Sequence, residues 1–425
     1  MYSGVADAEY DGWSEEANYR KYGWLYTVCI QFHKLQIAEP ADYSESRVKQ
    51  LLEQAEEGYN NALLDEKTVP KNLIVIMNES LADFSDFEGV NTNQEVLPYI
   101  HSLGKEDNVQ KGFVSVHTIA GGTCNTEWEF LTGTNIQMME NESWPYQMFY
   151  TNGKSAYTTE GITKSLKEAG YRTIAMHPNE ASNWNRDVVY PLMLFDEYLD
   201  IADYEGYHKL RGYISDKGNY AKIVDYYEQH TGEPLFIFNI TMQNHGGYLG
   251  NEGIDNQINL LDYEDLEVEN YLSSIHESDI AFEELLNYFS SVEENTMIVM
   301  FGDHFPQLAD EFYRYAYGNI ERIPGDKERM FVTPYIIWTN YEREYEEIPV
   351  MSIHYLSTYV KQEMGMELTD YEKYQLDFME QYPVVGKYGI ADQKHHFTIY
   401  DELTGEQQKL LREFKAVQYY HMKYQ

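Results

Sequence analysis

The stretch Ala120–Gly133, AGGTCNTEWEFLTG, decides the fold. Gly121 and Gly122 follow an apolar run, GFVSVHTIA, which predicts a strand, and the residues from Thr123 onward predict a helix. A hydroxyl between a strand end and a helix start lies among unpaired N–H groups, where the helix dipole favours negative charge. Thr123 is therefore a candidate nucleophile for attack on phosphorus, although a threonine in this position can also be an ordinary helix cap.

The composition narrows the function classes. The chain has 425 residues, 43% of them hydrophobic, and a formal net charge of −40. Such a charge argues against nucleic acid as a partner and against simple electrostatic docking onto anionic lipid. If the substrate is anionic, a metal ion or a local arginine must offset the acidic field. The alternative is that the acidic residues only form a solvated surface.

The number of cysteines and the lengths of the apolar runs do not decide the cellular compartment of the protein. The two cysteines, Cys29 and Cys124, allow one disulfide at most, and no run of 18 apolar residues predicts a membrane span. Met1 leads into the acidic segment YSGVADAEYDGW, which does not resemble the apolar core of a signal peptide. We therefore expect either a cytoplasmic protein or a portion of a longer one.

Strand-like and helix-like segments alternate along most of the chain. This alternation predicts an α/β fold with a mainly parallel sheet and helices on both faces. Residues 1 to about 70 read as mostly helical, and after about residue 351 helices and one further strand predict a smaller α+β part. The expected strands lie at 73–77, 112–119, 171–177, 234–242, 296–304 and 333–340.

Polar residues follow the ends of several expected strands. Ligands of open α/β sheets bind outside the carboxyl ends of the strands. Glu79, Asp303 and His304 stand at such ends and offer two oxygens and one nitrogen to a divalent cation, and Thr123 could complete the site. A cation there would lower the pKa of the threonine hydroxyl and prepare it for a two-step transfer.

Each of these residues also has an ordinary interpretation. Glu79 could be a surface carboxylate, and Asp303 and His304 could form a solvated turn. His245 could be a satisfied histidine near the core, and Arg186 could simply pair with Asp187 or with another carboxylate. The ordinary interpretations weaken jointly, because these residues follow predicted strand ends.

Five motifs in order make the interpretation specific. NLIVIMNES, GGTCNTEWEF, HPNEASNWNRDVVY, TMQNHGGY and VMFGDHFPQ resemble the motifs of the lipoteichoic acid synthase and phosphoglycerol transferase family. That family lies in the sulfatase-like branch of the alkaline phosphatase superfamily. The resemblance covers roughly residues 70 to 365, and it implies a sulfatase-like fold.

The resemblance also implies the chemistry of the metal site. Glu79, Thr123, Asp303 and His304 would bind one divalent metal, usually manganese or magnesium in this family, with zinc as a further option. Thr123 would be the nucleophile that takes up glycerol phosphate.

The same resemblance implies a substrate site. His177, Trp184 and Arg186 would hold the substrate, with Arg186 reaching the phosphate through its planar fork. His245 would line the same pocket and act as acid or base, since imidazole titrates near neutral pH.

Two departures from related families matter. Sulfatases carry a cysteine that matures to formylglycine within a Cys-x-Pro/Ala-Ser-Arg pattern, whereas Cys124 is followed by Asn-Thr-Glu, so we interpret it as a packing residue. Family members are usually anchored by membrane helices. We therefore expect a helical segment 1–68 that follows a missing anchor, a catalytic domain 69–365 and a C-terminal subdomain 366–425, on the extracellular face of the membrane.

The leading hypothesis is thus a metal-dependent phosphoglycerol transferase. Its donor would be phosphatidylglycerol, and its acceptor a lipoteichoic acid chain or a cell-surface glycan. A hydrolase of phosphodiesters or phosphomonoesters within the same superfamily is the second hypothesis, with water in place of the acceptor. The third is a non-catalytic acidic surface domain, which predicts that the expected ligands are scattered in space.

Overall fold

The chain is built around one eight-stranded sheet. The computed structural model describes residues 15–34, 39–65, 67–85, 87, 89–139, 145–148, 150–151, 154–155, 161–249, 254–317, 328–343 and 347–424. The acidic start of the chain, residues 1–14, therefore lies outside the described residues. Across the sheet the strands are β12 (Val350–Ser352), β2 (Val109–Ser115), β11 (Val332–Thr339), β10 (Thr296–Gly302), β1 (Asn72–Asn78), β9 (Leu235–Ile240), β5 (Arg172–Met176) and β6 (Glu197–Leu199).

The sheet is mainly parallel, as predicted. β1 pairs in parallel with β10 and β9, β9 with β5, and β5 with β6. β11 runs against both of its neighbours, β10 and β2, and β12 is parallel to β2. The carboxyl ends of β1, β5, β9 and β10 consequently meet at one edge, where a site is expected.

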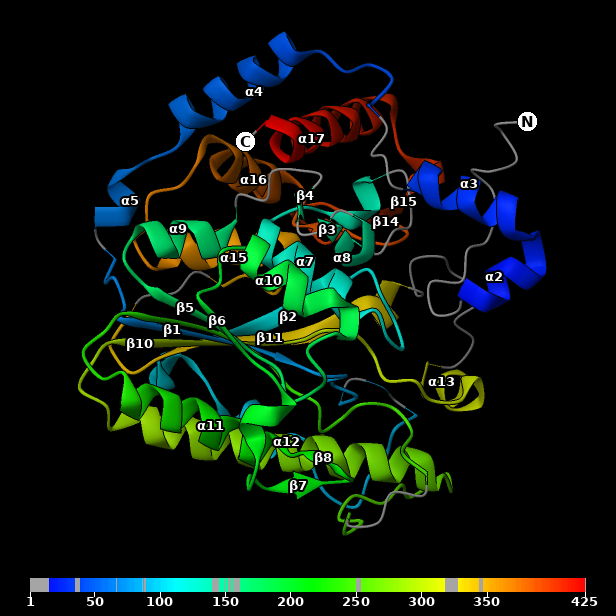
Figure 1. Cartoon of the computed structure of the whole chain (residues 1–425), viewed down its shortest axis with the longest axis vertical. Coiled ribbons are helices and arrows are strands. Elements are labelled where there is room, and N and C mark those ends of the chain that lie inside the picture. Colours follow the sequence, from blue (N-terminus) through cyan, green and yellow to red (C-terminus); the bar gives the residue numbers. More distant parts are fainter. Residues whose placement is uncertain are drawn as a thin grey trace.

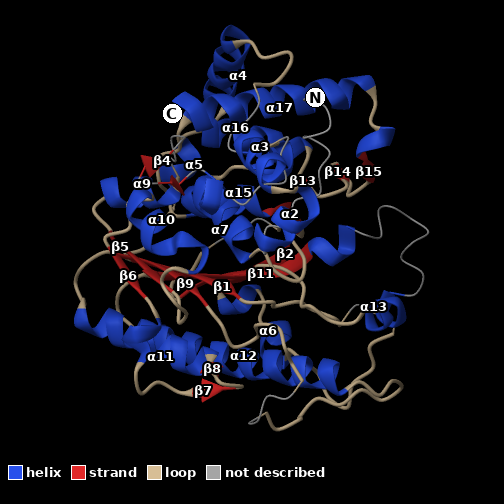
Figure 2. Cartoon of the chain, turned by 45° about the vertical axis from the view of Figure 1, so that its right-hand side comes forward, coloured by secondary structure: helices blue, strands red, loops and turns tan. Residues whose placement is uncertain are grey.

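Helices cover both faces of the sheet (Figures 1 and 2). Successive side chains of a strand point to opposite faces. Leu73, Val75 and Met77 of β1 belong to one buried apolar cluster, and Ile74 and Ile76 belong to the other. The first cluster lies under α7 (Thr123–Thr132), α9 (Ile162–Glu168), α10 (Arg186–Leu192) and α15 (Ile353–Glu363), and the second under α6 (Pro98–Ser102), α11 (Asp216–Gln229) and α12 (Leu266–Ser290).

A helix from the first part of the chain lies beside two C-terminal helices on the side of the first cluster (Figure 1). α4 (Glu45–Gly58) packs on α16 (Asp370–Gln381) and α17 (Gly405–Tyr424), and a three-stranded sheet of β13 (Val384–Val385), β14 (Gly389–Ala391) and β15 (Phe397–Ile399) adjoins them. This is the smaller α+β part expected after residue 351. The remaining elements are α2 (Glu15–Tyr22), α3 (Trp24–Lys34), α5 (Ala62–Asp65), α8 (Pro145–Met148), α13 (Asp310–Tyr317) and the hairpins β3–β4 (Tyr150–Thr151, Lys154–Ser155) and β7–β8 (Lys209–Leu210, Tyr213–Ile214).

The structure also gives the bounds of the strand expected over 112–119 and the state of the two cysteines. The strand expected over 112–119 spans Val109–Ser115 instead. The Val116 amide still donates to the Phe331 carbonyl in the register of the β2–β11 pairing, but Phe331 belongs to a short 3-10 helix, Arg329–Phe331, and the ladder ends there. Cys29 and Cys124 both carry free thiols, so the optional disulfide is not formed. Within the described residues, no helix combines the length and the apolar character needed to cross a membrane.

Candidate active site

Thr123 is the first residue of α7, as predicted. The three residues before it, Ala120, Gly121 and Gly122, have φ values of 57°, 136° and 85°. Positive φ suits glycine and is strained for alanine, so the loop is held in place by its surroundings. Its helix start directs unpaired N–H groups toward the space in front of the threonine.

Glu79, Asp303 and His304 come together beside this threonine. One ligand atom from each of the three lies within 4.8 Å of the others. Thr123 Oγ1 is 3.4 Å from Glu79 Oε2 and 3.4 Å from His304 Nε2, while His304 Nε2 is 3.2 Å from Asp303 Oδ2. All four side chains are buried. The four residues expected to hold a metal are thus neighbours, and not scattered as a non-catalytic domain would have them.

The hydrogen bonds of His304 and Asp303 keep metal-binding atoms directed at the centre of the cluster. His304 Nδ1 donates to the Phe305 carbonyl over 2.9 Å, so Nε2 is the ring nitrogen that faces the carboxylates and would bind a cation. Asp303 Oδ2 is buried and accepts no hydrogen bond from any residue that the structure describes. Burial, together with the Glu79 charge, raises the pKa of Asp303 to about 7. A divalent cation would satisfy the orphaned oxygen and offset the repulsion, so these residues fit a metal.

Short contacts tie the ligand-bearing loops to the nucleophile. Thr126 Oγ1 donates to the Asp303 carbonyl over 2.8 Å, and the Ala120 amide donates to the Phe305 carbonyl over 3.0 Å. On the other side, the Ser80 amide donates to Asp303 Oδ1 over 2.7 Å. The nucleophile and the expected ligands therefore form one connected body.

A cavity of about 630 Å³ opens in front of Thr123. All the expected substrate residues line it, and so do several that the sequence did not single out, such as Asn179, Asn183 and Gln307. The full lining is Glu79, Ser80, Ala120, Gly121, Gly122, Thr123, His177, Asn179, Asn183, Trp184, Arg186, Met242, His245, Gly246, His304 and Gln307. The cavity wall is mixed in character, with a half-buried indole, amides and imidazoles. Such a lining suits a small polar ligand that carries a phosphate.

His177 is a neutral hydrogen-bonding group in this wall. Its Nδ1 lies 3.3 Å from the Ile240 carbonyl, to which it donates, so Nε2 carries the lone pair. Burial, with the positive charge of Arg186 in addition, lowers the pKa of His177 well below its ordinary value. His177 is therefore suited to accept a hydrogen bond from a ligand hydroxyl.

Arg186 is less free than the sequence suggested. Its Nε and Nη2 donate to Glu127 Oε2 over 3.1 and 2.9 Å, and both side chains are buried. One edge of the guanidinium is thus occupied by a carboxylate from α7, and the rest of the group borders the cavity. The alternative that Arg186 pairs with a carboxylate is correct, but the partner is Glu127 and not the adjacent Asp187.

His245 lies exposed in the loop after β9, and a second arginine holds that loop. Arg211 Nη1 donates to the Gln243 carbonyl over 2.9 Å and Nη2 to the Gly247 carbonyl over 3.1 Å, so the clamp spans His245. The guanidinium also lies 4.5 Å from the ring centroid of Tyr248. Nothing in the local sequence signals this role, because the arginine stands in a hairpin more than thirty residues earlier.

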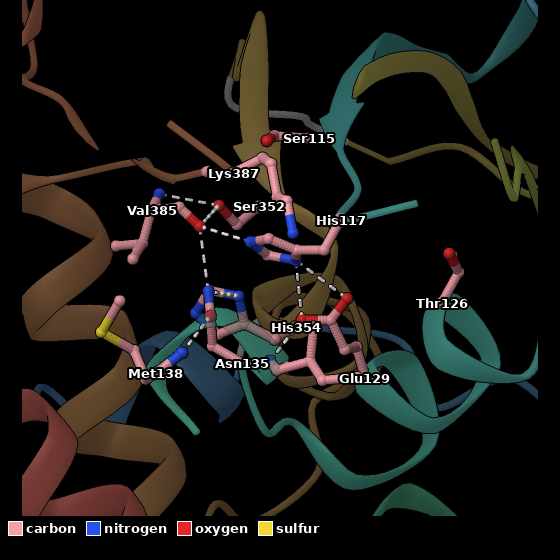
Figure 3. Close-up of polar contacts among 12 residues, drawn as sticks. Ser115, His117, Thr126, Glu129, Asn135, Met138, Ser352, His354, Val385 and Lys387 are labelled. Atoms are coloured by element: carbon pink, nitrogen blue, oxygen red, sulfur yellow. Dashed lines mark hydrogen bonds and ion pairs between the residues drawn. The ribbon is translucent and has the colours of Figure 1, made fainter. Parts of the chain in front are cut away.

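Behind α7 lies a buried polar cage that joins the nucleophile helix to the C-terminal part (Figure 3). His117 Nδ1 donates to Glu129 Oε2 over 3.0 Å and Nε2 donates to the Val385 carbonyl over 3.1 Å, so the ring is charged. Asn135 Nδ2 donates to the same carbonyl over 2.9 Å and to His354 Nδ1 over 3.1 Å. None of these side chains lines the cavity.

Comparisons with known proteins identify the family of the chain. A family model described as Sulfatase matches residues 71–361. A Rhizobium meliloti protein named for cyclic beta-1,2-glucan modification is 26% identical over 386 residues, 88% of this chain. Lipoteichoic acid synthase 2 of Bacillus subtilis is 27% identical over 245 residues, 56% of this chain. The chain spans 58% and 36% of the lengths of these two relatives.

A solved structure agrees in fold. The Streptococcus pyogenes phosphoglycerol transferase GacH, in complex with sn-glycerol-1-phosphate, matches with a TM-score of 0.69 at 19% identity. The match covers 91% of this chain and 95% of that one. At this identity the likeness shows that the two chains share a fold.

Proposed function

The chain belongs to the sulfatase family, in its lipoteichoic acid synthase-like branch, and on that premise we propose that it is a metal-dependent phosphoglycerol transferase. The observation that carries the proposal is the place of Thr123. Its hydroxyl lies 3.4 Å from both Glu79 and His304, at a helix start that faces a polar cavity. A nucleophile in that position meets donors where charge develops on phosphorus.

Glu79, Asp303, His304 and Thr123 would hold the metal. Two carboxylates, an imidazole and a hydroxyl can bind manganese, magnesium or zinc. The resemblance to the lipoteichoic acid synthase family favours manganese. When bound, the cation would lower the pKa of the Thr123 hydroxyl and neutralise phosphoryl oxygens.

The transfer would proceed in two halves. In the first, the Thr123 hydroxyl loses its proton to solvent and its Oγ1 attacks the phosphorus of phosphatidylglycerol. The bond from phosphorus to the diacylglycerol oxygen breaks, and that oxygen takes a proton. His245 borders the cavity and would supply this proton. In the second half, an acceptor hydroxyl gives its proton to His245 and attacks phosphorus. The bond from phosphorus to Thr123 Oγ1 breaks, and this oxygen takes a proton from solvent.

His177, Trp184 and Arg186 would hold the glycerol phosphate during both halves. The lone pair of His177 faces a glycerol hydroxyl, the indole covers the carbon chain, and Arg186 contacts the phosphate. The acceptor would be a lipoteichoic acid chain or a cell-surface glycan, outside the cell membrane, where donor headgroups are within reach.

The test is to incubate the protein and MnCl₂ with phosphatidylglycerol labelled in its headgroup, without an acceptor. We expect one glycerol phosphate on Thr123 by mass spectrometry, with an equal amount of diacylglycerol. Continuous release of free glycerol phosphate would favour the hydrolase hypothesis, and no product at all would contradict both the transferase and the hydrolase hypothesis.

A second experiment tests the metal ligands. Manganese-soaked crystals should show one anomalous peak in contact with Glu79, Asp303 and His304, and a peak elsewhere would contradict the assigned ligands.

A further inference from the structure

We propose that Glu127 is a positioning residue that holds the Arg186 guanidinium at the cavity wall. This inference rests on the proposed function, because it concerns the same phosphate site. Glu127 does not border the cavity and would act only through Arg186. Its special feature is that it stands on the nucleophile's own helix.

The helix brings nucleophile and carboxylate to the same side. Thr123 and Glu127 are four residues apart on α7, and side chains at that spacing share one face of a helix. Arg186 is the first residue of α10, on the other side of the cavity. The pair of hydrogen bonds between Glu127 and Arg186 therefore connects the two groups that would contact the same phosphoryl group.

Glu127 is held as firmly as it holds its partner. Oε1 accepts a hydrogen bond from the Tyr146 hydroxyl over 2.8 Å and a further, short one from the Tyr190 hydroxyl. Burial, together with the Glu127 charge, raises the pKa of both tyrosines well above the ordinary value, so both remain donors. The carboxylate thus has partners for both oxygens and a fixed orientation.

Arg186 has N–H groups that Glu127 does not use and that remain available to a ligand. A guanidinium has five N–H groups in a fixed fork. Glu127 takes those of Nε and one of Nη2, and no hydrogen bond among the described residues uses Nη1. Because Arg186 lines the cavity, the remaining N–H groups are the ones available to phosphoryl oxygens.

The backbone just before Arg186 is strained, and the ion pair with Glu127 helps to hold it in place. Trp184 and Asn185 have φ values of 58° and 56°, a left-handed conformation that costs free energy for residues other than glycine. The ion pair at the start of α10 holds this turn from one side, and with it the indole in the cavity wall. Loss of the carboxylate should therefore loosen the arginine and weaken recognition of the phosphate.

The experiment compares Glu127→Gln with Glu129→Gln. Both residues are fully buried carboxylates on α7 with a cationic partner, but Glu129 faces the cage behind the helix. We expect Glu127→Gln to raise the Kd of the manganese-loaded protein for inorganic phosphate at least tenfold and to lower kcat/KM for phosphatidylglycerol at least hundredfold. Glu129→Gln, assayed well below its melting temperature, should change both by less than threefold.

Two further measurements distinguish loss of the positioning role from a general failure to fold. Glu127→Asp retains the charge but is one methylene shorter, so it should fold and show an intermediate loss even if Glu127→Gln does not fold. Crystals of the variant that folds should show Arg186 displaced from the cavity wall. If the wild type transfers no glycerol phosphate, the proposed function fails, whereas a weakened phosphate affinity in the Glu127 variants still supports the positioning role. An unchanged phosphate Kd with Arg186 in place would overturn it.

Discussion

His304 directs Nε2 at Thr123 Oγ1 over 3.4 Å while its other ring nitrogen donates to the Phe305 carbonyl over 2.9 Å. The same carbonyl receives the Ala120 amide over 3.0 Å. One backbone oxygen thus sets both the tautomer of an expected metal ligand and the position of the loop that presents the nucleophile. This relationship fixes the expected ligand and the nucleophile relative to each other.

Thr123→Ala should abolish transfer. The variant removes the attacking oxygen, and the two contacts that this oxygen makes, at 3.4 Å, are too long to contribute much to stability. We expect kcat to fall below detection while the melting temperature changes by only a few degrees. Thr123→Ser, which keeps a hydroxyl, should retain measurable activity. An alanine variant with full activity would exclude Thr123 as the nucleophile.

Manganese should stabilise the protein more at pH 8 than at pH 5.5. Burial and the Glu79 charge raise the pKa of Asp303 to about 7 from its ordinary 3.8. The stability that this group gives the metal-free protein is therefore present at low pH and lost as pH rises through about 7. Below that value a cation must displace the proton, so its affinity falls up to about tenfold per pH unit. Melting curves with and without MnCl₂ at both pH values measure the effect, and an equal shift at both would contradict it.

Arg211→Ala should affect both stability and activity. The variant loses two hydrogen bonds from a buried charged group to the carbonyls of Gln243 and Gly247, at a cost of about 2–4 kcal/mol in the free energy of unfolding. The released loop carries His245, so kcat/KM should fall about tenfold to hundredfold. Lys209→Ala, an exposed change in the same hairpin, is the matched control and should leave urea midpoint and kcat/KM unchanged. If the two variants behave alike, the clamp is unimportant.

Glu129→Gln should destabilise the protein in a pH-dependent way. Burial alone would lower the pKa of His117, but the Glu129 carboxylate raises it above its ordinary 6.5. The stability from this charged histidine is complete below pH 6.5 and is lost as pH rises through the higher pKa of the folded state. Removing one partner of a buried ion pair should cost about 3–5 kcal/mol at pH 6 and less at pH 9, as read from urea unfolding. An equal cost at both pH values would show that His117 carries no charge.

Much of the fold and of the expected site follows from the sequence. Continuous apolar runs identify β1, β5, β9 and β10, and the polar residues after them lie at one edge of the sheet because parallel strands end together. The helix from Thr123 begins where the glycines predict it. The predicted end of the strand over 112–119 was wrong. The apolar alternation of GFVSVHTIA continues past Ser115, but the partner strand β11 begins only at Val332, after a 3-10 helix that the local sequence of β2 cannot reveal.

The supporting contacts could not be predicted in the same way. Glu127 meets a partner 59 residues away, and the carbonyl partners of Arg211 follow it by 32 and 36 residues. Such pairs depend on how α7, α10 and the β7–β8 hairpin pack in space, which no local pattern specifies. A buried carboxylate also looks like any other glutamate in a chain with 71 acidic residues.

The cage behind α7 sets the order in which the protein can mature. His117 donates to the carbonyl of Val385, 268 residues later, and Asn135 exchanges hydrogen bonds with Gln418, 283 residues later. At a synthesis rate of roughly 5–20 residues per second, these partners emerge about 15–55 s after the helix that carries the nucleophile. During that interval these hydrogen bonds cannot form, so the packing behind α7 is completed only after the segment that contains Val385 and Gln418 has been made.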